Sequence, residues 1–340
     1  MKILLVGETH FGSRTPQRAQ ALRDLGHEVT AIGTAPADWT YETKPRMIDR
    51  ILYRLRLPLD RANAGEALAR AAKGHDLVLL DNARAIRPWA LRAALQANPA
   101  PKIVWFSEDD MLNPEHRTWW TGWSLGLFDL CVTTKSFNAR PEELSALGAR
   151  RVLFVNNTYC PHTHRPILVD EAERKRCGAP VSFVGTFESP RAAMVLALTR
   201  AGIPVRVWGN GWRRLRETHP LLTIEHKSVY GDDYRRVVAA SQVNLCFLRH
   251  ANRDLQTCRS IEIPAMGGFM LHEQSHEMAA LLAPDREAAY FRDADDLVGR
   301  CRFWLDSGKR ESITAAGHAR VVNGGFSHAE RWRTILERIS

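Results

Sequence analysis

Short apolar runs alternate with longer amphipathic stretches through the first half of the chain. Six runs read as strands, at 2–7, 27–33, 76–81, 102–107, 130–134 and 151–157. Apolar residues recur at helical spacing from Ala19 to Leu25, Gly26 is placed to end that helix, and another helix is expected over 87–98. Strands that alternate with helices in this way are typical of βαβ units and a parallel sheet.

The alternation stops near 158–178, where proline, histidine and charged residues show no clear period. We expect the connection between two domains there. The alternation then restarts with strands at 181–187, 204–212, 222–229, 243–250 and 268–273, and helices over 190–201, over 231–240 and from about Thr257 to Met266. The sequence therefore predicts two Rossmann-like domains, whose carboxyl strand ends would border a central cleft where open α/β proteins bind ligands.

Composition narrows the class of protein. A chain of 340 residues suits two domains, and 45% hydrophobic with 25% charged residues is typical of a globular protein. The first apolar run is too short for a signal peptide, and no run of about 18 apolar residues could span a bilayer. Six scattered cysteines without a C-x-x-C pair favour the cytoplasm. A net charge of +9 favours anionic partners: nucleotide phosphates, acidic lipid headgroups or nucleic acid.

The segment NRDLQTCRSIEIPAMGGFML at 252–271 combines charge with the start of a predicted helix. A strand, a polar loop and a helix amino terminus form a cradle for an anion, in which Thr257 caps the helix or donates to a phosphate and Arg259 supplies a cation. Asp254 and Glu262, separated by seven residues, would accept hydrogen bonds from the hydroxyls of a sugar and a ribose. The alternative is that Asp254 and Arg259 form a surface ion pair and Glu262 faces solvent.

Further candidates follow other strands of the second half. Gly185 would let a phosphate or sugar approach the backbone, and Arg191 in the next helical turn would reach a diphosphate. Gly209, in the loop WGNGW, and Tyr230 are candidates for the nucleotide side. An ordinary turn with a solvated arginine, or a turn that carries packed tryptophans, is the alternative interpretation.

The first half offers two groups at strand ends. Ser13 and Arg14, in FGSR, would contact donor phosphate or acceptor. Glu108, Asp109 and Asp110 form a carboxylate cluster whose members would raise one another's pKa and serve acid/base or metal chemistry; a solvated acidic loop is the alternative.

Two segments have competing interpretations. The segment CPHTH at 160–164 has a cysteine and two histidines but lacks a fourth ligand for zinc, so a polar connection is favoured. The segment 43–62 has basic residues with apolar ones at helical spacing. Packing of an amphipathic helix on its own domain is favoured there, and a face for a membrane or an acidic acceptor is the alternative.

The strings NRDLQTCRSIEIPAMGGFMLHE, GIPVRVWGNGW, FVGTFESPR, TTKSFN and LGARRVLFVNN resemble the CgeB-type (spore maturation protein-like) glycosyltransferases, over about 1–330. The resemblance implies a GT-B fold with domains at 1–165 (acceptor) and 166–326 (donor) and a terminal helix at 327–340 that crosses back. It also implies the signature of retaining enzymes, in which two glutamates are separated by seven residues. Glu262 matches the ribose-binding glutamate, whereas Asp254 replaces the first by a residue one methylene shorter.

We therefore expect a glycosyltransferase that moves a hexose from a nucleoside diphosphate donor, UDP favoured over GDP, to an unidentified acceptor with retention of configuration. We expect no essential metal and no further cofactor. The expected catalytic residues are Asp254, Arg259 and Asp109, and Asn252 and Arg253 join the donor-binding set. The alternatives are a non-catalytic nucleotide-sugar binding protein and a DNA-modifying glycosyltransferase, and no groove-reading helix supports the latter.

Overall fold

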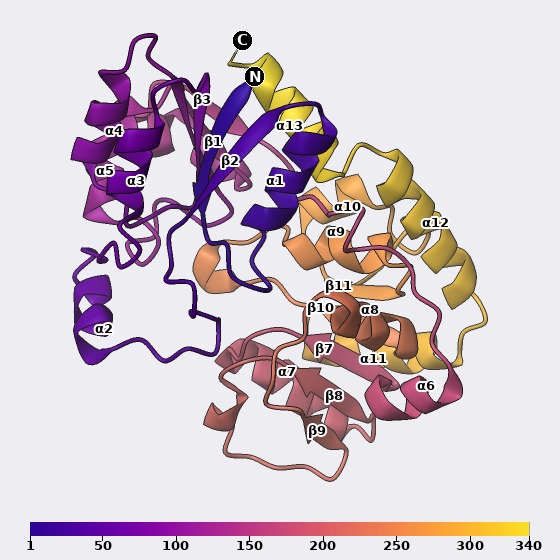
Figure 1. Cartoon of the computed structure of the whole chain (residues 1–340). Coiled ribbons are helices and arrows are strands. Elements are labelled where there is room, and N and C mark those ends of the chain that lie inside the picture. Colours follow the sequence, from indigo (N-terminus) through magenta and orange to yellow (C-terminus); the bar gives the residue numbers. More distant parts are fainter. Residues whose placement is uncertain (340) are drawn as a thin grey trace. The chain divides into compact units, whose positions relative to one another are not determined.

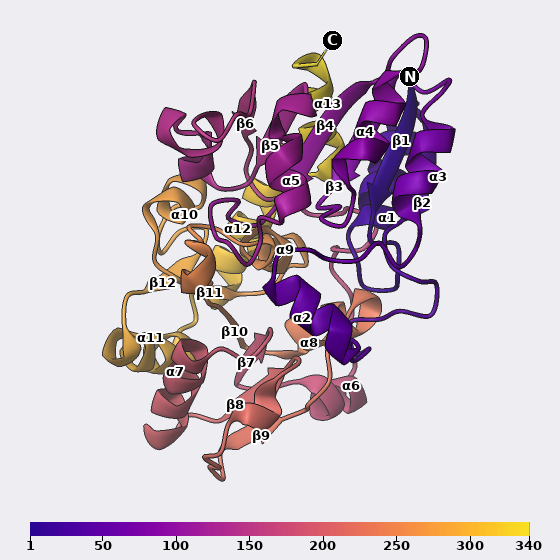
Figure 2. The ribbon, with the colours of Figure 1, turned by 90° about the vertical axis from the view of Figure 1, so that its left-hand side faces the viewer.

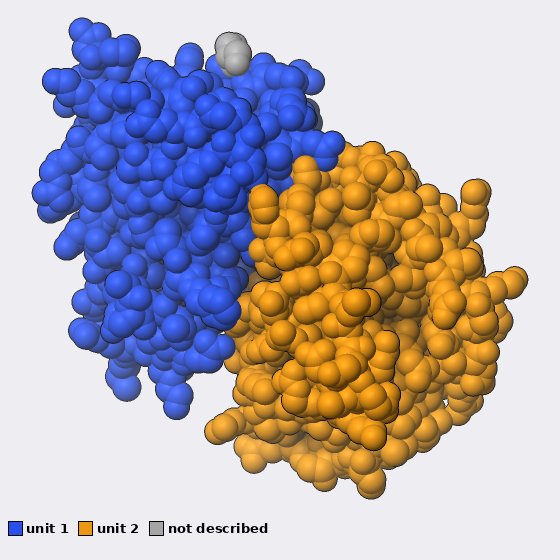
Figure 3. All heavy atoms as spheres, turned by 45° about the vertical axis from the view of Figure 1, so that its right-hand side comes forward, with its two compact units in different colours: residues 1–156, 250–254, 328–340 blue, residues 157–249, 255–327 orange. Residues whose placement is uncertain are grey.

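The computed structural model describes residues 1–339 and divides into two compact units (Figures 1 and 3). Unit 1 contains Met1–Asn156, the short segment His250–Asp254 and the chain from His328 onward. Unit 2 contains Asn157–Arg249 and Leu255–Ser327. The segment 158–165 therefore belongs to unit 2, ahead of the 165/166 boundary expected from the sequence.

Unit 1 is built on a parallel sheet in the order β2-β1-β3-β4-β5-β6. The strands are β1 Lys2–Gly7, β2 Glu28–Gly33, β3 Leu77–Asp81, β4 Lys102–Ser107, β5 Leu130–Thr133 and β6 Val152–Phe154. The helices are α1 Thr15–Asp24, α2 Met47–Arg54, α3 Ala64–Ala71, α4 Pro88–Leu95, α5 Trp119–Ser124 and α13 His328–Glu337. Short helical turns lie at η1 Leu125–Leu127, η2 Ser136–Ala139, η3 Pro141–Ser145 and η5 His250–Asn252.

Both faces of this sheet are buried. α3 and α4 cover one face through Leu68, Ala90 and Leu91, and α1 and α13 cover the other. Strands enclosed on both sides are apolar at every position, which explains the continuous apolar runs in the sequence. The helix α1 ends before Gly26, whose φ of 83° is accessible to glycine at little cost.

Unit 2 has a parallel sheet in the order β12-β11-β10-β7-β8-β9. Its strands are β7 Val181–Val184, β8 Val205–Trp208, β9 Leu222–Ile224, β10 Val243–Cys246, β11 Met270–Glu273 and β12 Ala289–Phe291. Its helices are α6 Glu171–Cys177, α7 Ser189–Arg200, η4 Trp212–Arg214, α8 Gly231–Ala240, α9 Cys258–Ala265, α10 His276–Leu281, α11 Ala294–Asp306 and α12 Arg310–Asn323. Counted within the unit, this is the 3-2-1-4-5-6 strand order of dinucleotide-binding folds.

Two layers of helices enclose the unit 2 sheet. α7 and α11 bury Val195, Leu198 and Cys301 on one face, while α8, α9, α10 and α12 cover the other. The strand β12 was not predicted from the sequence, and the segment 158–178, which shows no clear period, contains the helix α6. In that segment Asp170 caps α6 by accepting a hydrogen bond from the Glu173 backbone N–H at 2.7 Å.

Candidate functional site

In unit 2 the strand order reverses between β7 and β10, and the expected donor residues follow these two strands. β7 comes first in the sequence, the next two strands continue on one side of it, and β10 begins the other side. Open α/β sheets bind ligands outside the carboxyl ends of the strands at such a reversal. Gly185 and Arg191 follow β7, whereas Thr257 and Arg259 follow β10.

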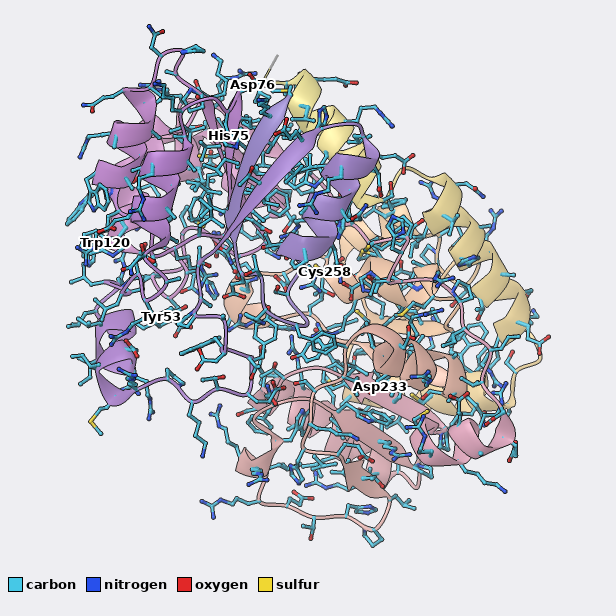
Figure 4. All side chains as sticks on the ribbon, in the orientation of Figure 1. Tyr53, His75, Asp76, Trp120, Asp233 and Cys258 are labelled. Atoms are coloured by element: carbon cyan, nitrogen blue, oxygen red, sulfur yellow. The ribbon has the colours of Figure 1, made fainter. Side chains whose placement is uncertain are left out.

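Thr257 is the N-cap of α9, as one of its two expected roles requires. The Ser260 hydroxyl accepts a hydrogen bond from the Thr257 backbone N–H at 2.9 Å and lies 2.7 Å from His272 Nε2. Beside Ser260, the buried His272 and Cys246 stabilise each other's charged form. Burial raises the pKa of Cys246 and lowers that of His272. Their mutual attraction, with smaller contributions from Thr257 and Arg259 at Cys246 and from Glu273 at His272, outweighs burial, so the net pKa of Cys246 is lowered and that of His272 raised. The first turn of α9 thus rests on a polar, fully buried support (Figure 4 labels Cys258, its first residue).

Arg259 occupies the second position of α9 and is half-buried. Its guanidinium forms no ion pair or hydrogen bond with any side chain in the described range 1–339. A cation beside a helix amino terminus suits a phosphate or diphosphate, because the helix dipole also favours negative charge there. The alternative ion pair with Asp254 is absent from the described residues, because Asp254 pairs with another cation.

Glu262 lies one turn further along α9, and its side chain is only 4% exposed. His164 Nε2 lies 3.7 Å from its Oε1. Because His164 Nδ1 accepts the backbone N–H of Cys160 at 3.1 Å, the proton of a neutral ring is on Nε2, facing Glu262. The segment 160–164 therefore orients a histidine toward the carboxylate. Within 1–339, no group of three or more His, Cys, Asp or Glu side chains is arranged to hold a metal ion.

Asp254 belongs to unit 1, unlike Glu262, and its side chain is 7% exposed. Its Oδ1 accepts hydrogen bonds from the buried ammonium of Lys135, which follows β5, and from Asn252 Nδ2 at 2.8 Å. This carboxylate was expected to accept sugar hydroxyls, and in the structure it has two protein donors. Lys135 was missed as a candidate, although its position directly after a strand end is the signal that could have identified it.

Asn252 and Arg253, expected at the donor, hold the segment His250–Asp254 onto the rest of unit 1. Asn252 Oδ1 accepts the Asp110 backbone N–H at 2.8 Å. Arg253 donates to Asp110 at 2.6 and 2.8 Å and to both oxygens of Glu143 at 2.9 Å, and it lies over the Phe137 ring at 4.0 Å. The charge-assisted bonds of Arg253, together with the Asn252 hydrogen bond, fix the loop in place.

Arg191, Gly185 and Gly209 have structural partners in unit 2. Arg191 is buried, donates to the Thr186 carbonyl at 3.2 Å and lies 3.4 Å from Glu188. A Cβ on Gly209, whose φ is 144°, would lie 2.1 Å from the Gly185 carbonyl oxygen, so these two loops need glycine to pack together. The half-buried Tyr230 precedes α8 as its N-cap residue.

Arg249 was not identified from the sequence. It follows β10 at the strand-order reversal, is 38% exposed, and its Nε lies 3.1 Å from Glu188, which Arg191 also contacts. Glu188 is thus shared by two arginines, one after each central strand. The arginine at the end of the strand-like run VNLCFLRH was the available signal.

The carboxylates at 108–110 do not form the expected mutually raising cluster. They point to three different cations: Glu108 pairs with Arg18 at 2.5 Å, Asp109 with Arg84, and Asp110 with Arg253. Burial raises the pKa of Asp109 and Asp110, but the arginines and neighbouring hydrogen bonds outweigh it, so both pKa values are lowered. That part of the sequence interpretation is wrong, because each carboxylate has its own counter-ion.

Ser13 and Arg14 lie after β1, in the loop that leads to α1. The buried Ser13 hydroxyl donates within its own loop, to the carbonyls of Glu8 and His10 at 2.7 and 2.6 Å, and Arg14 lies 3.9 Å from Glu108. Beneath them, Thr15 donates to the buried Asp81 at 2.7 Å and Arg18 does so at 2.5 Å. This network lies next to β1 and β3, the two strands between which the strand order of unit 1 reverses.

Unit 1 also has a cavity of about 520 Å³, and Glu8, whose carbonyl accepts from Ser13, is one of its lining residues. It is lined by the segments after β1 and β2 and by α2. Its lining includes Glu8, Trp39, Asp49, Arg50 and Tyr53. An aromatic ring together with carboxylates and arginines suits a polar organic ligand.

Replacing Arg253 tests whether it stabilises unit 1 as the counter-ion of Asp110 and Glu143. Arg253→Gln should reduce the stability of unit 1 by about 2 kcal/mol at pH 7, because two carboxylates lose their counter-ion. Arg253 lowers the pKa of Glu143 by direct hydrogen bonds, and it lowers that of Asp110 against burial. A lowered folded-state pKa contributes stability above the unfolded value of about 4 that is lost as pH falls through the folded value. The difference in Tm between wild type and variant should therefore narrow below about pH 4.

Arg292→Gln is the matched control, since that exposed arginine pairs with Asp296 on the surface and should cost at most about 1 kcal/mol. A difference in Tm that stays constant from pH 7 to pH 3 would contradict the assignment to Arg253.

Comparisons with known proteins agree with this architecture. Residues 191–337 match the family model described as glycosyl transferase-like. The fold is similar to that of sucrose-phosphate synthase from Thermosynechococcus elongatus, at 14% identity and a TM-score of 0.67, covering 99% of this chain and 98% of that one. It is also similar to an α,α-trehalose-phosphate synthase (UDP-forming) from Burkholderia vietnamiensis, at 11% identity, a TM-score of 0.66 and full coverage of both chains.

Anabaena HepE, solved in complex with UDP and glucose, is a further neighbour. It is 12% identical, with a TM-score of 0.62 and coverage of 100% of this chain and 99% of that one. A search of curated proteins found no match. The two parallel six-stranded α/β sheets and these full-length matches show a GT-B fold. Within the described residues, no helix has the length and apolar character needed to cross a membrane.

Proposed function

We propose that this protein is a glycosyltransferase that moves a sugar from a nucleoside diphosphate donor to an acceptor. The observation that carries the proposal is the arrangement at the strand-order reversal of unit 2. There, α9 presents a capped amino terminus, an unpaired Arg259 and, one turn on, the carboxylate of Glu262. The match of residues 191–337 to the glycosyl transferase-like model covers this region and supports the same assignment.

In this proposal different residues of α9 bind the diphosphate and the ribose of the donor. The helix amino terminus and Arg259 bind the diphosphate and stabilise the negative charge that develops on it as the bond to the anomeric carbon breaks. Glu262 accepts hydrogen bonds from the ribose hydroxyls. The acceptor oxygen bonds to the anomeric carbon, and its proton leaves with the departing diphosphate.

The proposal includes transfer of a hexose with retention of configuration and without an essential metal. Retention follows the family signature that Asp254 and Glu262 resemble. A UDP donor is favoured because HepE was solved with UDP and the trehalose-phosphate synthase is named as UDP-forming. Six cysteines that form no disulfide within the described residues suit a cytoplasmic location.

A thermal-shift comparison of nucleotides tests the donor. A ligand at 100 times its Kd stabilises the native state by about 2.7 kcal/mol, so UDP should raise Tm by a few degrees and GDP or ADP by less. Turnover of UDP-sugars then separates an enzyme from a protein that only binds them, and the anomeric signal of the product by NMR tests retention. Equal shifts with all nucleotides would contradict the UDP preference, and no shift with any of them would contradict the donor site.

A further inference from the structure

The helix α2 exposes the face that a surface helix normally buries. Met47, Ile48, Ile51 and Leu55 lie on one stripe, because they are spaced one, four and eight residues from Met47. Met47 is 77% exposed, the other three are exposed as well, and α2 has no buried residue. A helix that packs on its own domain, as the sequence analysis favoured, would turn this stripe inward. That expectation is wrong for α2.

Polar contacts hold α2 in this orientation. Asp49 accepts two hydrogen bonds from Arg61, at 3.0 and 2.8 Å, and the Tyr53 hydroxyl accepts one from Arg84 at 2.9 Å. Asp49 and Tyr53 lie on the side of α2 opposite the apolar stripe and line the 520 Å³ cavity. Figures 1 and 2 show α2 apart from the other helices of unit 1, and Figure 4 shows Tyr53 on the side of α2 toward that unit. The apolar stripe therefore faces outward because the polar side is bonded inward.

Exposed tryptophans extend the stripe beyond the end of α2. Trp119 Nε1 donates to the Leu55 carbonyl at 3.1 Å, and the Arg56 guanidinium lies 4.4 Å from the Trp119 ring. Trp119 and Trp123 are exposed, with ring centroids 6.0 Å apart. Tryptophan is enriched where a protein meets the headgroup layer of a membrane. We define the α2 patch as Met47, Ile48, Ile51, Leu55, Trp119 and Trp123.

Exposed basic residues precede α2 and lie on it. Lys44, Arg46, Arg50 and Arg54 form no ion pair with any residue in the part of the chain that the structure describes, and Arg50 and Arg54 also line the cavity. The one acidic residue of α2, Asp49, is already paired with Arg61. An apolar stripe with a cationic border fits a surface that is anionic outside and apolar inside. A second copy of this chain would instead bring like charges together.

We propose that the α2 patch docks unit 1 on a membrane surface that contains acidic lipids. α2 lies in the plane of the interface, with its apolar stripe among the acyl chains near the headgroups and with Lys44 and Arg46, which precede the helix, on the lipid phosphates. The inference does not depend on glycosyl transfer, because it rests on the exposure and charge of unit 1 alone.

Co-sedimentation with lipid vesicles tests this docking. The full-length protein should bind vesicles of phosphatidylcholine with phosphatidylglycerol, bind pure phosphatidylcholine much more weakly, and dissociate as salt is raised. Ile48→Ser with Ile51→Ser should weaken binding by about tenfold or more, and Arg46→Ala by about fivefold. Because these side chains are exposed, the variants should keep the wild-type Tm.

Phe303→Ser is the matched control, since Phe303 is an exposed apolar residue on α11 of unit 2 and should leave vesicle binding unchanged. Absence of binding to acidic vesicles would overturn the proposal, as would equal binding of wild type and the Ile48/Ile51 double variant. Dimerisation that the double variant abolishes, without vesicle binding, would assign the patch to a second copy instead.

Discussion

Arg259→Ala should lower the kcat of glycosyl transfer by about a hundredfold or more while the protein keeps its wild-type Tm. The loss corresponds to one charge-stabilising donor removed from the leaving group, about 2.7–4 kcal/mol. The fold should be unaffected, because Arg259 forms no hydrogen bond or ion pair with a side chain within residues 1–339 and its attraction for Cys246 is the smallest of the influences on the pKa of that thiol. Steady-state kinetics with a saturating donor, alongside thermal unfolding, measure both quantities.

Arg259→Lys and Arg286→Ala are the controls for this experiment. Lysine keeps the charge but not the planar fork of donors, so Arg259→Lys should recover part of the lost rate. Arg286 is an exposed arginine of unit 2 before β12, and its removal should leave kcat unchanged. If Arg259→Ala kept wild-type kcat with every donor that is turned over, the cation would have no part in the reaction.

Glu262→Ala should raise the KM for the donor by about tenfold or more, with a smaller effect on kcat. A charge-assisted hydrogen bond to a ribose hydroxyl is worth about 1.5–3 kcal/mol and is present in both ground and transition states. Calorimetry with the nucleoside diphosphate alone should show the same loss in affinity, because the ribose is present in both ligands.

Two further variants separate binding from structure at this buried position. Glu262→Gln keeps the shape and one acceptor, so it should retain the fold and lose part of the affinity. His164→Phe removes the ring nitrogen that lies 3.7 Å from Glu262 and should change the Tm more than the KM, since His164 contacts the buried carboxylate. If a folded Glu262→Ala protein bound the donor with unchanged affinity, Glu262 would not be the residue that binds the ribose.

The spacing of apolar residues predicted most of the helices and strands. Strands that are buried on both faces of a sheet appear in the sequence as continuous apolar runs. The strand β4 occupies 102–107 and the helix α8 occupies 231–240, as expected. The three-residue strand β12 was missed, because so short a run carries no period. α6 was missed because its residues are mostly charged, so its capping residue Asp170 was the better signal.

The position of residues directly after strands identified the candidate site residues. It did not identify the side chains that pair with them. The sequence lists Glu108, Asp109 and Asp110 side by side, whereas consecutive residues in a loop point in different directions and here meet three different arginines. Two of these cations, Arg18 and Arg253, are about 90 and 140 residues away in the chain. A pKa depends on such neighbours, so adjacency in sequence predicted its direction wrongly.

The sequence by itself determined the two parallel α/β sheets and the helix that begins after Thr257, because apolar spacing and capping are local properties. Only the tertiary structure decided that Asp254 belongs with Lys135 in unit 1, that Arg259 keeps an unpaired cation, and that α2 turns its apolar stripe outward. Each of these depends on which distant side chain fills a hydrogen bond or covers a surface. The spacing of residues along the chain does not predict which distant side chains will meet.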